Sequence, residues 1–261
     1  MRDYHMHSHL CRHGQGEIFQ YVESAIAKGV SEIGFAEHIP IPDLDDPTGR
    51  MRIDDWDRYV NDVMSAQKKY PEITIRFGIE ADYLPAHMTF IEKFLSDYPF
   101  DYIIGSVHFV GDWDFSNPAL AHRLGEIGVN RLHFLYYKLI EEAAATGLYD
   151  IIGHFDLPKK VEPPTQDMTE NIAAALRALE KYDLALDANT SGLRKEPGEV
   201  YPKKEILQQA FLLNIPVVLG SDAHKPSEVA ADFQEIVNML KSIGYEQTCV
   251  FEQRNRSFVD L

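Results

Sequence analysis

Short apolar segments alternate with amphipathic helical patterns along most of this chain, and this alternation constrains its fold more than any other feature. Apolar segments typical of buried strands lie at residues 2–7, 32–36, 73–80, 101–107, 149–153, 184–188 and 215–220. Alternating strands and helices predict a parallel sheet with right-handed crossover connections. Because seven such units occur, we expect an α/β fold whose sheet closes into a barrel rather than staying open.

The segments between the expected strands carry apolar residues at helical spacing. Such stripes lie at Ile18, Val22, Ala25 and Ile26, and within 56–64, 132–143, 172–179 and 229–240. We interpret them as helix faces that pack on the sheet, with no cofactor role. No internal repeat or low-complexity linker divides the chain, so we expect residues 1–261 to form a single domain.

Composition and charge exclude several classes of function. Hydrophobic residues make up 45% of the chain, which suits a globular core, and no run of about eighteen apolar residues predicts a membrane span. There is no signal-peptide pattern and there are only two cysteines, Cys11 and Cys249, so we expect a cytoplasmic protein. A formal net charge of −16 disfavours nucleic acid as a partner. It does not exclude a small anionic substrate, because bound cations would reverse the local field.

Four of the eleven histidines lie within the first thirteen residues. His5 and His7 alternate along an expected strand, so their side chains point to the same side and can bind one metal ion. His13 follows beside Gly14 and Gly16 and can fold back toward a neighbouring ion. The alternative is a disordered terminus or an affinity tag. A tag would be a homogeneous run, whereas here His alternates with other residues, so the spacing favours a metal site.

Further metal-binding residue types follow the other expected strands. A parallel barrel places the carboxyl ends of all its strands at one rim, where active sites lie. Taken singly, Glu80 could be an acid at a helix N-terminus and Asp222 an N-cap. However, six of the seven strands deliver His, Glu or Asp to the same rim: His5 and His7, Glu37 and His38, Glu80, His108, His154, and Asp222 with His224. Nine candidate ligands, which include His13 but not Glu37, are too many for one ion and suit two or three.

The motifs around these residues resemble the polymerase and histidinol phosphatase (PHP) superfamily. They span residues 3–224 in order, and no ligand position is empty. The matching motifs are Asp3-Tyr4-His5-Met6-His7-Ser8 with His13, Ala36-Glu37-His38, Gly78-Ile79-Glu80, Gly105-Ser106-Val107-His108, Gly153-His154 and Gly220-Ser221-Asp222-Ala223-His224. The resemblance implies a distorted (β/α)7 TIM-like barrel of parallel strands, with a trinuclear metal centre at the C-terminal rim.

The resemblance also implies how the ligands divide among three divalent ions. The first ion would bind His5, His7, Glu80 and Asp222. Glu80 would bridge to a second ion, which also binds His108 and His154, and the third would bind His13, His38 and His224. Glu80, Asp222 and His224 are the expected catalytic residues. Imidazole and carboxylate ligands suit zinc, iron or manganese, and the sequence does not choose among them.

Two further segments resemble the histidinol-phosphate phosphatase branch of the superfamily. They are residues 106–116 and Gly153-His154-Phe155-Asp156-Leu157, and the length of the chain also fits this branch. We therefore expect hydrolysis of a phosphomonoester, L-histidinol phosphate, to L-histidinol and phosphate. The expected mechanism is in-line attack by a hydroxide that bridges two ions.

A phosphate ester needs basic side chains, and the rim offers three. Arg194 follows the sixth strand, and its planar fork suits bidentate phosphate binding. Lys159 and Lys160 follow the fifth strand and are the other candidates. Each of the three could instead be a solvated surface cation. His9 has no place among the metal ligands, and we expect it to line the substrate pocket.

The leaving group needs a proton, and histidinol carries an imidazole. Asp156, Glu37 and Asp112 are candidates for the proton donor, and the sequence does not choose among them. Trp113 and Phe115 could pack on the substrate's imidazole or form the core of a lid.

The remaining histidines, His87, His122 and His133, are expected to be structural or surface residues. The connections at 39–53 and 109–130 are long, and both carry Pro, Gly and acidic residues. Long connections in compact domains are often functional, so His122 could contact substrate.

Two alternatives to a histidinol-phosphate phosphatase stay open. One is another phosphoesterase, phosphodiesterase or nuclease of the same superfamily, although the acidic charge disfavours polynucleotides. The other is a protein that stores or senses metal without turnover, but an open rim with long loops favours catalysis. The sequence does not decide the oligomeric state, so a homo-oligomer also stays open.

Overall fold

In the computed structural model, which describes residues 1–42, 44, 46 and 49–261, seven parallel strands form one sheet. Residues 43, 45, 47 and 48 of the long loop 39–53 lie outside the described part of the chain. The strands of the sheet are, in spatial order, β1 (Arg2–Asp3), β2 (Glu32–Phe35), β3 (Thr74–Asp82), β4 (Tyr102–Ser106), β7 (Ile151–Ile152), β8 (Ala185–Asn189) and β9 (Val217–Gly220). Spatial order thus follows chain order, as successive right-handed βα units require.

The first and last strands of the sheet meet, so the sheet nearly closes. The backbone N–H of Tyr4 donates to the carbonyl of Leu219 at 2.9 Å, and Met6 pairs with Ala223 in a parallel bridge. These contacts replace a regular ladder after Asp3, which is why β1 is shorter than the expected strand at 2–7. The expected distorted, TIM-like barrel is confirmed.

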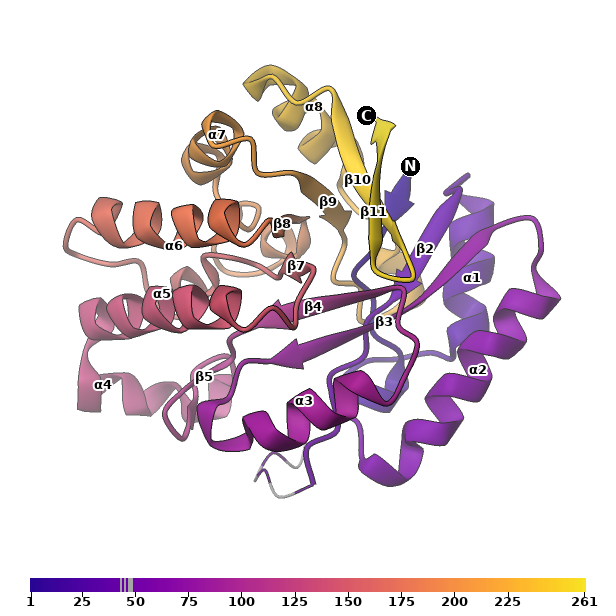
Figure 1. Ribbon diagram of the computed structural model, residues 1–261, viewed down its shortest axis with the longest axis horizontal. Coiled ribbons are helices and arrows are strands. Elements are labelled where there is room, and N and C mark those ends of the chain that lie inside the picture. Colours follow the sequence, from indigo (N-terminus) through magenta and orange to yellow (C-terminus); the bar gives the residue numbers. More distant parts are fainter. Residues whose placement is uncertain (43, 45, 47–48) are drawn as a thin grey trace.

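Helices cover the outside of this barrel (Figure 1). They are α1 (Ile18–Ala27), α2 (Trp56–Lys69), α3 (Met88–Ser96), α4 (Leu124–Ile127), α5 (Val129–Ala145), α6 (Thr169–Lys181), α7 (Lys204–Leu212) and α8 (Phe233–Ile243). The expected stripes of α1, α2, α5 and α6 face inward at the buried residues Val22, Tyr59, Leu132 and Leu176. Two of their members, Ile26 and Met64, are exposed instead. The stripe expected at 229–240 starts before its helix, because Val229 precedes α8, which begins at Phe233.

In the described part of the chain, two β-hairpins lie outside the barrel sheet. β5 (Phe109–Val110) pairs with β6 (Trp113–Asp114) inside the expected long connection 109–130. At the C-terminus, β10 (Gln247–Glu252) pairs with β11 (Asn255–Asp260), a hairpin that the alternation pattern did not predict. Figure 1 shows this yellow hairpin beside the N-terminus and β9. The backbone N–H of Phe251 donates to the Tyr4 hydroxyl at 3.0 Å, so the hairpin is anchored to the N-terminal end of the barrel.

Short 3-10 helices occupy most of the remaining ordered connections. They are η1 (His9–Cys11), η2 (Ile53–Asp55), η3 (Pro85–His87), η4 (Pro118–Arg123), η5 (Leu157–Lys160), η6 (Ser191–Arg194) and η7 (Pro226–Glu228). None of the helices in the described part of the chain has the length and apolar character that crossing a membrane requires.

Apolar side chains fill the inside of the barrel next to the strand starts. The Tyr102 ring is fully buried, and its hydroxyl donates to the carbonyl of Tyr4 at 2.7 Å. To reach it, the ring crosses Gly78 and Gly34, where an added Cβ would lie 2.3 Å and 2.2 Å from the nearest ring or hydroxyl atom. Only glycine leaves room for this crossing, so both glycines are needed for the Tyr102 ring to fill the barrel interior.

Candidate metal centre

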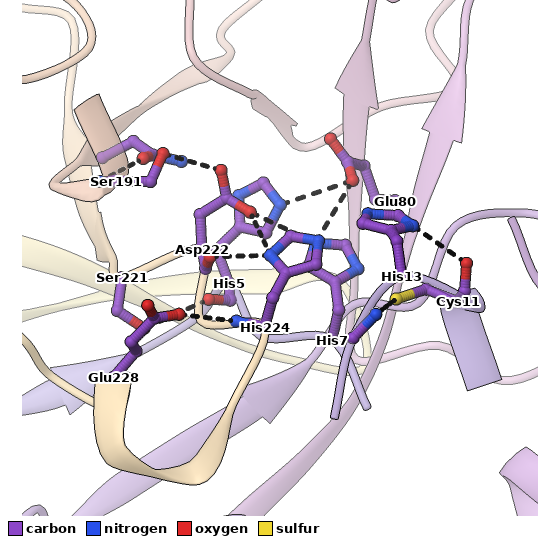
Figure 2. Close-up of polar contacts among 12 residues, drawn as sticks. His5, His7, Cys11, His13, Glu80, Ser191, Ser221, Asp222, His224 and Glu228 are labelled. Atoms are coloured by element: carbon purple, nitrogen blue, oxygen red, sulfur yellow. Dashed lines mark hydrogen bonds and ion pairs between the residues drawn. The ribbon is translucent and has the colours of Figure 1, made fainter. Parts of the chain in front are cut away.

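The nine predicted ligands converge at the C-terminal ends of the strands. They come from β3 and from the residues just after β1, η1, β2, β4, β7 and β9: His5, His7, His13, His38, Glu80, His108, His154, Asp222 and His224. In Figure 2 the rings of His5, His7 and His224 lie between the carboxylates of Asp222 and Glu80. The fold therefore brings together every residue that the sequence predicted as a metal ligand.

Glu80 lies at the centre of this cluster and is only 1% exposed. Its Oε2 atom lies 2.9 Å from His38 Nδ1 and 3.4 Å from Nε2 of both His5 and His7. These three rings come from two neighbouring strand ends, so one carboxylate oxygen gathers ligands that are far apart in the sequence.

The other carboxylate oxygen of Glu80 faces a second set of groups. Its Oε1 atom lies 2.9 Å from His154 Nε2 and 3.7 Å from His108 Nε2, and it accepts the Ser106 hydroxyl at 2.5 Å. A carboxylate whose two oxygens face separate sets of nitrogen atoms is suited to bridge two metal ions.

A further group of rings stacks beside His7. The ring centroids of His38 and His224 lie 4.4 Å and 4.5 Å from that of His7, and His13 lies 4.5 Å from His224. Asp222 borders the group, with its Oδ1 3.6 Å from His7 Nε2. Side chains from both ends of the chain thus meet at one point.

Ligand atoms of these residues come close enough to hold ions in several combinations. Five sets have ligand atoms within 4.8 Å of one another: His5, Glu80 and His154; His5, His7 and Asp222; His38, Glu80 and His108; His7, His38 and His224; and Cys11, His13 and His224. The sets share members, so they describe one continuous cluster. Cys11 is the one residue among them that the sequence did not suggest as a ligand.

The two carboxylates of the cluster are ionised. Burial would raise the pKa of Glu80, but the surrounding imidazoles, His38 above all, hold it well below its usual range. Burial likewise opposes the charge on Asp222, and Lys195 with the nearby imidazoles holds the pKa of its carboxyl well below the usual range. Both side chains therefore offer negatively charged oxygen ligands at neutral pH.

Two imidazoles have raised pKa values because they lie between carboxylates. Burial disfavours the charged ring of His5, but Glu80 and Asp187 outweigh it and raise the pKa well above its usual range. Burial acts in the same direction on His108, where Asp82 and Glu80 raise the pKa to about 9. In the metal-free protein both rings are therefore protonated on both nitrogens and positively charged at neutral pH.

Other imidazoles are neutral and have nitrogen atoms with no hydrogen bond. Burial lowers the pKa of His7 well below its usual range and that of His224 to about 3. Among the ligand candidates, both ring nitrogens of His7, His154 Nδ1 and His224 Nε2 are buried with no hydrogen-bond partner in the described part of the chain, and so is Nε2 of the protonated His5 ring. An unpaired buried polar atom costs about 1–3 kcal/mol. Free imidazole nitrogens beside ionised carboxylates are the donor set that divalent transition metals prefer, so the residues fit the implied metals.

Two carboxylates that the sequence did not suggest fix the orientation of the rings. His5 Nδ1–H donates to Asp187 Oδ2 at 2.7 Å, and Asn189 Nδ2 donates to the same oxygen at 2.9 Å. His108 Nδ1–H donates to Asp82 Oδ1 at 2.8 Å. In each case the other nitrogen, Nε2, is left to point into the cluster. Asp187 lies in β8, the one strand for which no ligand was expected. A charged residue inside an otherwise apolar, buried strand was the feature of the sequence that could have indicated its role.

The backbone is strained at two of the ligand positions. His154 and Asp222 have φ angles of 25° and 51°, in the left-handed region that side chains other than glycine rarely adopt. At Gly220 an added Cβ would lie 2.2 Å from Asp187 Oδ1, so glycine is needed beside the carboxylate that orients His5. Strain of this kind persists where function requires a particular geometry.

A cavity of about 250 Å³ opens above the cluster. Seven of the ligand candidates line it, and so do basic, acidic and hydroxyl side chains that could meet a substrate: Asp46, Arg50, Asp114, Ser116, Lys160 and Lys195. Of these, only Lys160 was singled out from the sequence. The expected long connections 39–53 and 109–130 supply four of the six, which explains their length.

Two lysines point their charge toward this cavity. Lys160 Nζ donates to the carbonyl of Ser116 at 2.8 Å; burial, with Lys195 nearby, lowers its pKa to about 8. Lys195 Nζ lies 3.3 Å from Ser191 Oγ and 3.5 Å from Asp222 Oδ2. Both ammonium groups therefore lie next to the ligand cluster.

Arg194 and Lys159, the other expected phosphate-binding residues, lie elsewhere. Arg194 donates to the carbonyl of Ser221 at 2.6 Å and to Asp232 at 3.2 Å, and it lines a neighbouring hollow rather than the metal cavity. Lys159 forms ion pairs with Asp156 at 2.9 Å and Glu199 at 3.0 Å. Both cations have acidic partners, and neither is among the residues that line the metal cavity.

His9 also lies outside the cavity lining. Its Nδ1 atom lies 3.1 Å from the carbonyl of Gly16, and Glu17 is 3.7 Å away, so it holds the N-terminal loop together. His133 is buried in α5 with Nε2 2.9 Å from the carbonyl of Glu162, and His122 is exposed on η4.

The three expected proton donors do not line the cavity either. Asp112 is exposed and pairs with Arg123 at 2.9 Å. Glu37 is buried and accepts the Ser8 hydroxyl at 2.5 Å; burial raises its pKa to about 8. Asp156 belongs to the ion pair with Lys159. Within the connection 109–130, the carboxylate that lines the cavity is that of Asp114, in β6.

The aromatic residues of the same hairpin form a core. Trp113 and Phe115 are each 2% exposed and pack in the cluster that contains Tyr136. Trp113 Nε1 donates to the carbonyl of Leu120 at 3.0 Å. This arrangement corresponds to the lid core that the sequence left as one of two options.

Comparison with known proteins identifies relatives of the whole chain. Residues 3–191 match the PHP domain family. A protein of Deinococcus radiodurans described as a probable histidinol-phosphatase is 38% identical over 253 residues, covering 97% of this chain and 96% of that protein. The histidinol-phosphatase of Bacillus subtilis is 32% identical over 259 residues, covering 89% of this chain and 97% of that protein.

A solved structure has the same fold. It is the crystal structure of histidinol phosphate phosphatase from Lactococcus lactis, complexed with zinc, L-histidinol and phosphate. It matches with a TM-score of 0.84 at 23% sequence identity, covering 98% of each chain.

The protonated rings of His5 and His108 predict that metal uptake releases protons. A metal must displace the proton on the coordinating nitrogen, so zinc added to the metal-free protein at pH 7 should release protons. As pH rises toward 9, where His108 loses its proton, the affinity for zinc should rise and then level off. Titration calorimetry in buffers of different ionisation enthalpy measures the number released. His108→Gln should release fewer protons, whereas the exposed His122→Gln should match the native protein; no release at pH 7 would contradict this charge assignment.

Proposed function

Because this chain belongs to the PHP domain family, we propose that it is a metal-dependent phosphatase that hydrolyses L-histidinol phosphate to L-histidinol and phosphate. The observation that carries the proposal is the complete set of nine ligand candidates around one buried carboxylate, beneath a cavity that two lysines line. Relatives over nearly the whole chain are named histidinol-phosphatases, which supports the choice of substrate.

We propose that three divalent ions bind as the family resemblance implies. His5, His7, Glu80 and Asp222 would hold the first, Glu80, His108 and His154 the second, and His13, His38 and His224 the third. Zinc is the first metal to test, because the related Lactococcus lactis structure contains it; iron and manganese suit the same donors. When bound, such ions supply Lewis acidity that activates water and offsets the charge of a phosphate ester.

The chain's own residues would bind and orient the substrate around this centre. Lys160 and Lys195 lie in the cavity lining and can donate to phosphate oxygens. Glu80 and Asp222, with His224, keep their proposed catalytic roles as ligands at the centre of the site. The positive charges of Lys160 and Lys195 would orient the phosphate group over the ligand cluster, which favours in-line displacement.

We also propose that residues 1–261 act as a single barrel domain in the cytoplasm. Cys11 and Cys249 are both free and buried, which fits a reducing compartment.

Removal of metal tests the proposed activity. Native protein should release phosphate from L-histidinol phosphate, and dialysis against a chelator should abolish that release because the ligand cluster alone cannot activate water. Zinc or manganese should restore it. Phosphate release is measured in parallel with p-nitrophenyl phosphate and a dinucleotide. Full activity after verified metal removal, or preference for the dinucleotide, would contradict the proposal.

The charge of Lys160 predicts a pH dependence of substrate binding. Lys160 carries its proton below its pKa of about 8, so KM should rise as pH increases through that value. Lys160→Met should raise KM roughly 10- to 100-fold at pH 7, the cost of one charged hydrogen bond, and should lose the rise above pH 8. The exposed Lys241→Met is the matched control. An unchanged KM in Lys160→Met would remove this lysine from the phosphate site.

A further inference from the structure

We propose that Arg50 is a positioning residue for the metal ligand His108 and acts through Asp82. The proposal rests on the metal site of the proposed function. Arg50 comes from the loop between β2 and η2, and neither it nor Asp82 was expected to serve the site. Both side chains are buried, with 5% and 1% of their surface exposed.

A continuous chain of contacts links the three residues. Arg50 Nη1 donates to Asp82 Oδ2 at 3.1 Å. The other oxygen, Asp82 Oδ1, accepts from His108 Nδ1 at 2.8 Å and from the His108 backbone N–H at 3.2 Å. The carboxylate therefore has one oxygen held by the arginine and one committed to the histidine.

His108 depends on this carboxylate for its orientation. Within the described part of the chain, the His108 ring has one hydrogen-bond acceptor, which is the Asp82 carboxylate. With Nδ1–H directed at Asp82, the opposite nitrogen, Nε2, points toward Glu80, whose Oε1 lies 3.7 Å away. A rotation of the Asp82 side chain would turn this ring out of the cluster.

Arg50 is itself held in place by several groups. Its Nε donates to Asp46 Oδ2 at 2.8 Å, and Nη1 also reaches the carbonyl of Ile39 at 3.2 Å. The guanidinium lies over the Phe109 ring, 5.5 Å from its centroid. A residue fixed from three directions can transmit its own position to the carboxylate it binds.

The physical reason for an arginine is the burial of Asp82. A carboxylate that is almost completely buried is costly unless it is paired and hydrogen-bonded. Loss of Arg50 would leave Asp82 with His108 alone and with one oxygen unpaired, so the carboxylate would turn toward water. His5 has a different arrangement, because Asn189 holds its partner Asp187 at 2.9 Å.

Arg50 also lines the cavity, so direct contact with the substrate phosphate is the competing role. The two roles make different predictions. A positioning residue affects metal affinity in the absence of substrate and acts through Asp82. A phosphate contact affects KM and leaves metal affinity unchanged.

A double-mutant cycle on zinc affinity separates the two roles. The dissociation constant of the weakest-bound zinc is measured by competition with a chromogenic chelator for Arg50→Met, Asp82→Asn and the double variant. Asp82→Asn should weaken binding roughly 10- to 100-fold and Arg50→Met about 10-fold, as loss of supporting hydrogen bonds does. The double variant should bind zinc no more weakly than Asp82→Asn alone, because both changes break one chain of contacts.

Arg52→Met is the matched control, since Arg52 lies in the same loop with a side chain that is 64% exposed and 3.9 Å from Asp54. It should bind zinc as the native protein does. Melting curves establish that each variant folds; if Arg50→Met does not, Arg50→Lys replaces it in the cycle with a smaller expected loss. In cobalt-loaded protein the absorption bands should change in Arg50→Met and not in Arg52→Met.

Two results would overturn the inference. One is unchanged zinc affinity in Arg50→Met with a raised KM, which would make Arg50 a phosphate contact. The other is a loss of zinc affinity in the double variant that equals the product of the losses in the two single variants, because the two residues would then act independently. Because zinc binding is measured without substrate, the test stands even if the protein hydrolyses none of the phosphate esters offered to it.

Discussion

The buried carboxylate of Glu80 is the group on which the rest of the structure depends. It lies in a low-dielectric interior where an isolated charge would be prohibitively costly, and it is stable there because five imidazoles face its two oxygens. Three of those imidazoles, His5, His7 and His154, have buried ring nitrogens with no hydrogen-bond partner in the described part of the chain. Neither set is satisfied by hydrogen bonds alone, so the cluster is built for bound cations rather than for stability of the metal-free chain.

The barrel supplies what such a cluster requires. Parallel strands in chain order bring their carboxyl ends to one rim, and near closure between Tyr4 and Leu219 places the first strand beside the last. Apolar packing around Tyr102 fills the other end. Asp187 and Asp82 then fix the rings of His5 and His108, and the loops supply Arg50, Lys160 and Lys195 at the mouth of the cavity. The chemistry is local, whereas its geometry is a property of the whole sheet.

The fold and the ligand set could be predicted because both leave periodic or repeated marks in the sequence: apolar strands recur, and a His, Glu or Asp follows most of them. The supporting residues leave weaker marks. Asp187 is recognisable only as a charge inside a buried strand, and Asp82 lies two residues beyond an obvious ligand. The phosphate-binding cations depend on side-chain direction: Arg194 and Lys195 are adjacent, yet one turns to Ser221 and Asp232 and the other to the cavity. Sequence spacing does not decide between neighbours at the end of a 3-10 helix.

We propose that Glu80 would hold separate ions in one centre, and the metal content of a Glu80→Gln variant tests this most directly. The variant keeps the size of the side chain and removes its charge. Native protein and variant are saturated with zinc, desalted and analysed by mass spectrometry of the metal, with melting curves to establish folding. The account predicts that Glu80→Gln loses more than one zinc ion per chain relative to the native protein. A variant that retains the native zinc content, or loses only one ion, would contradict it.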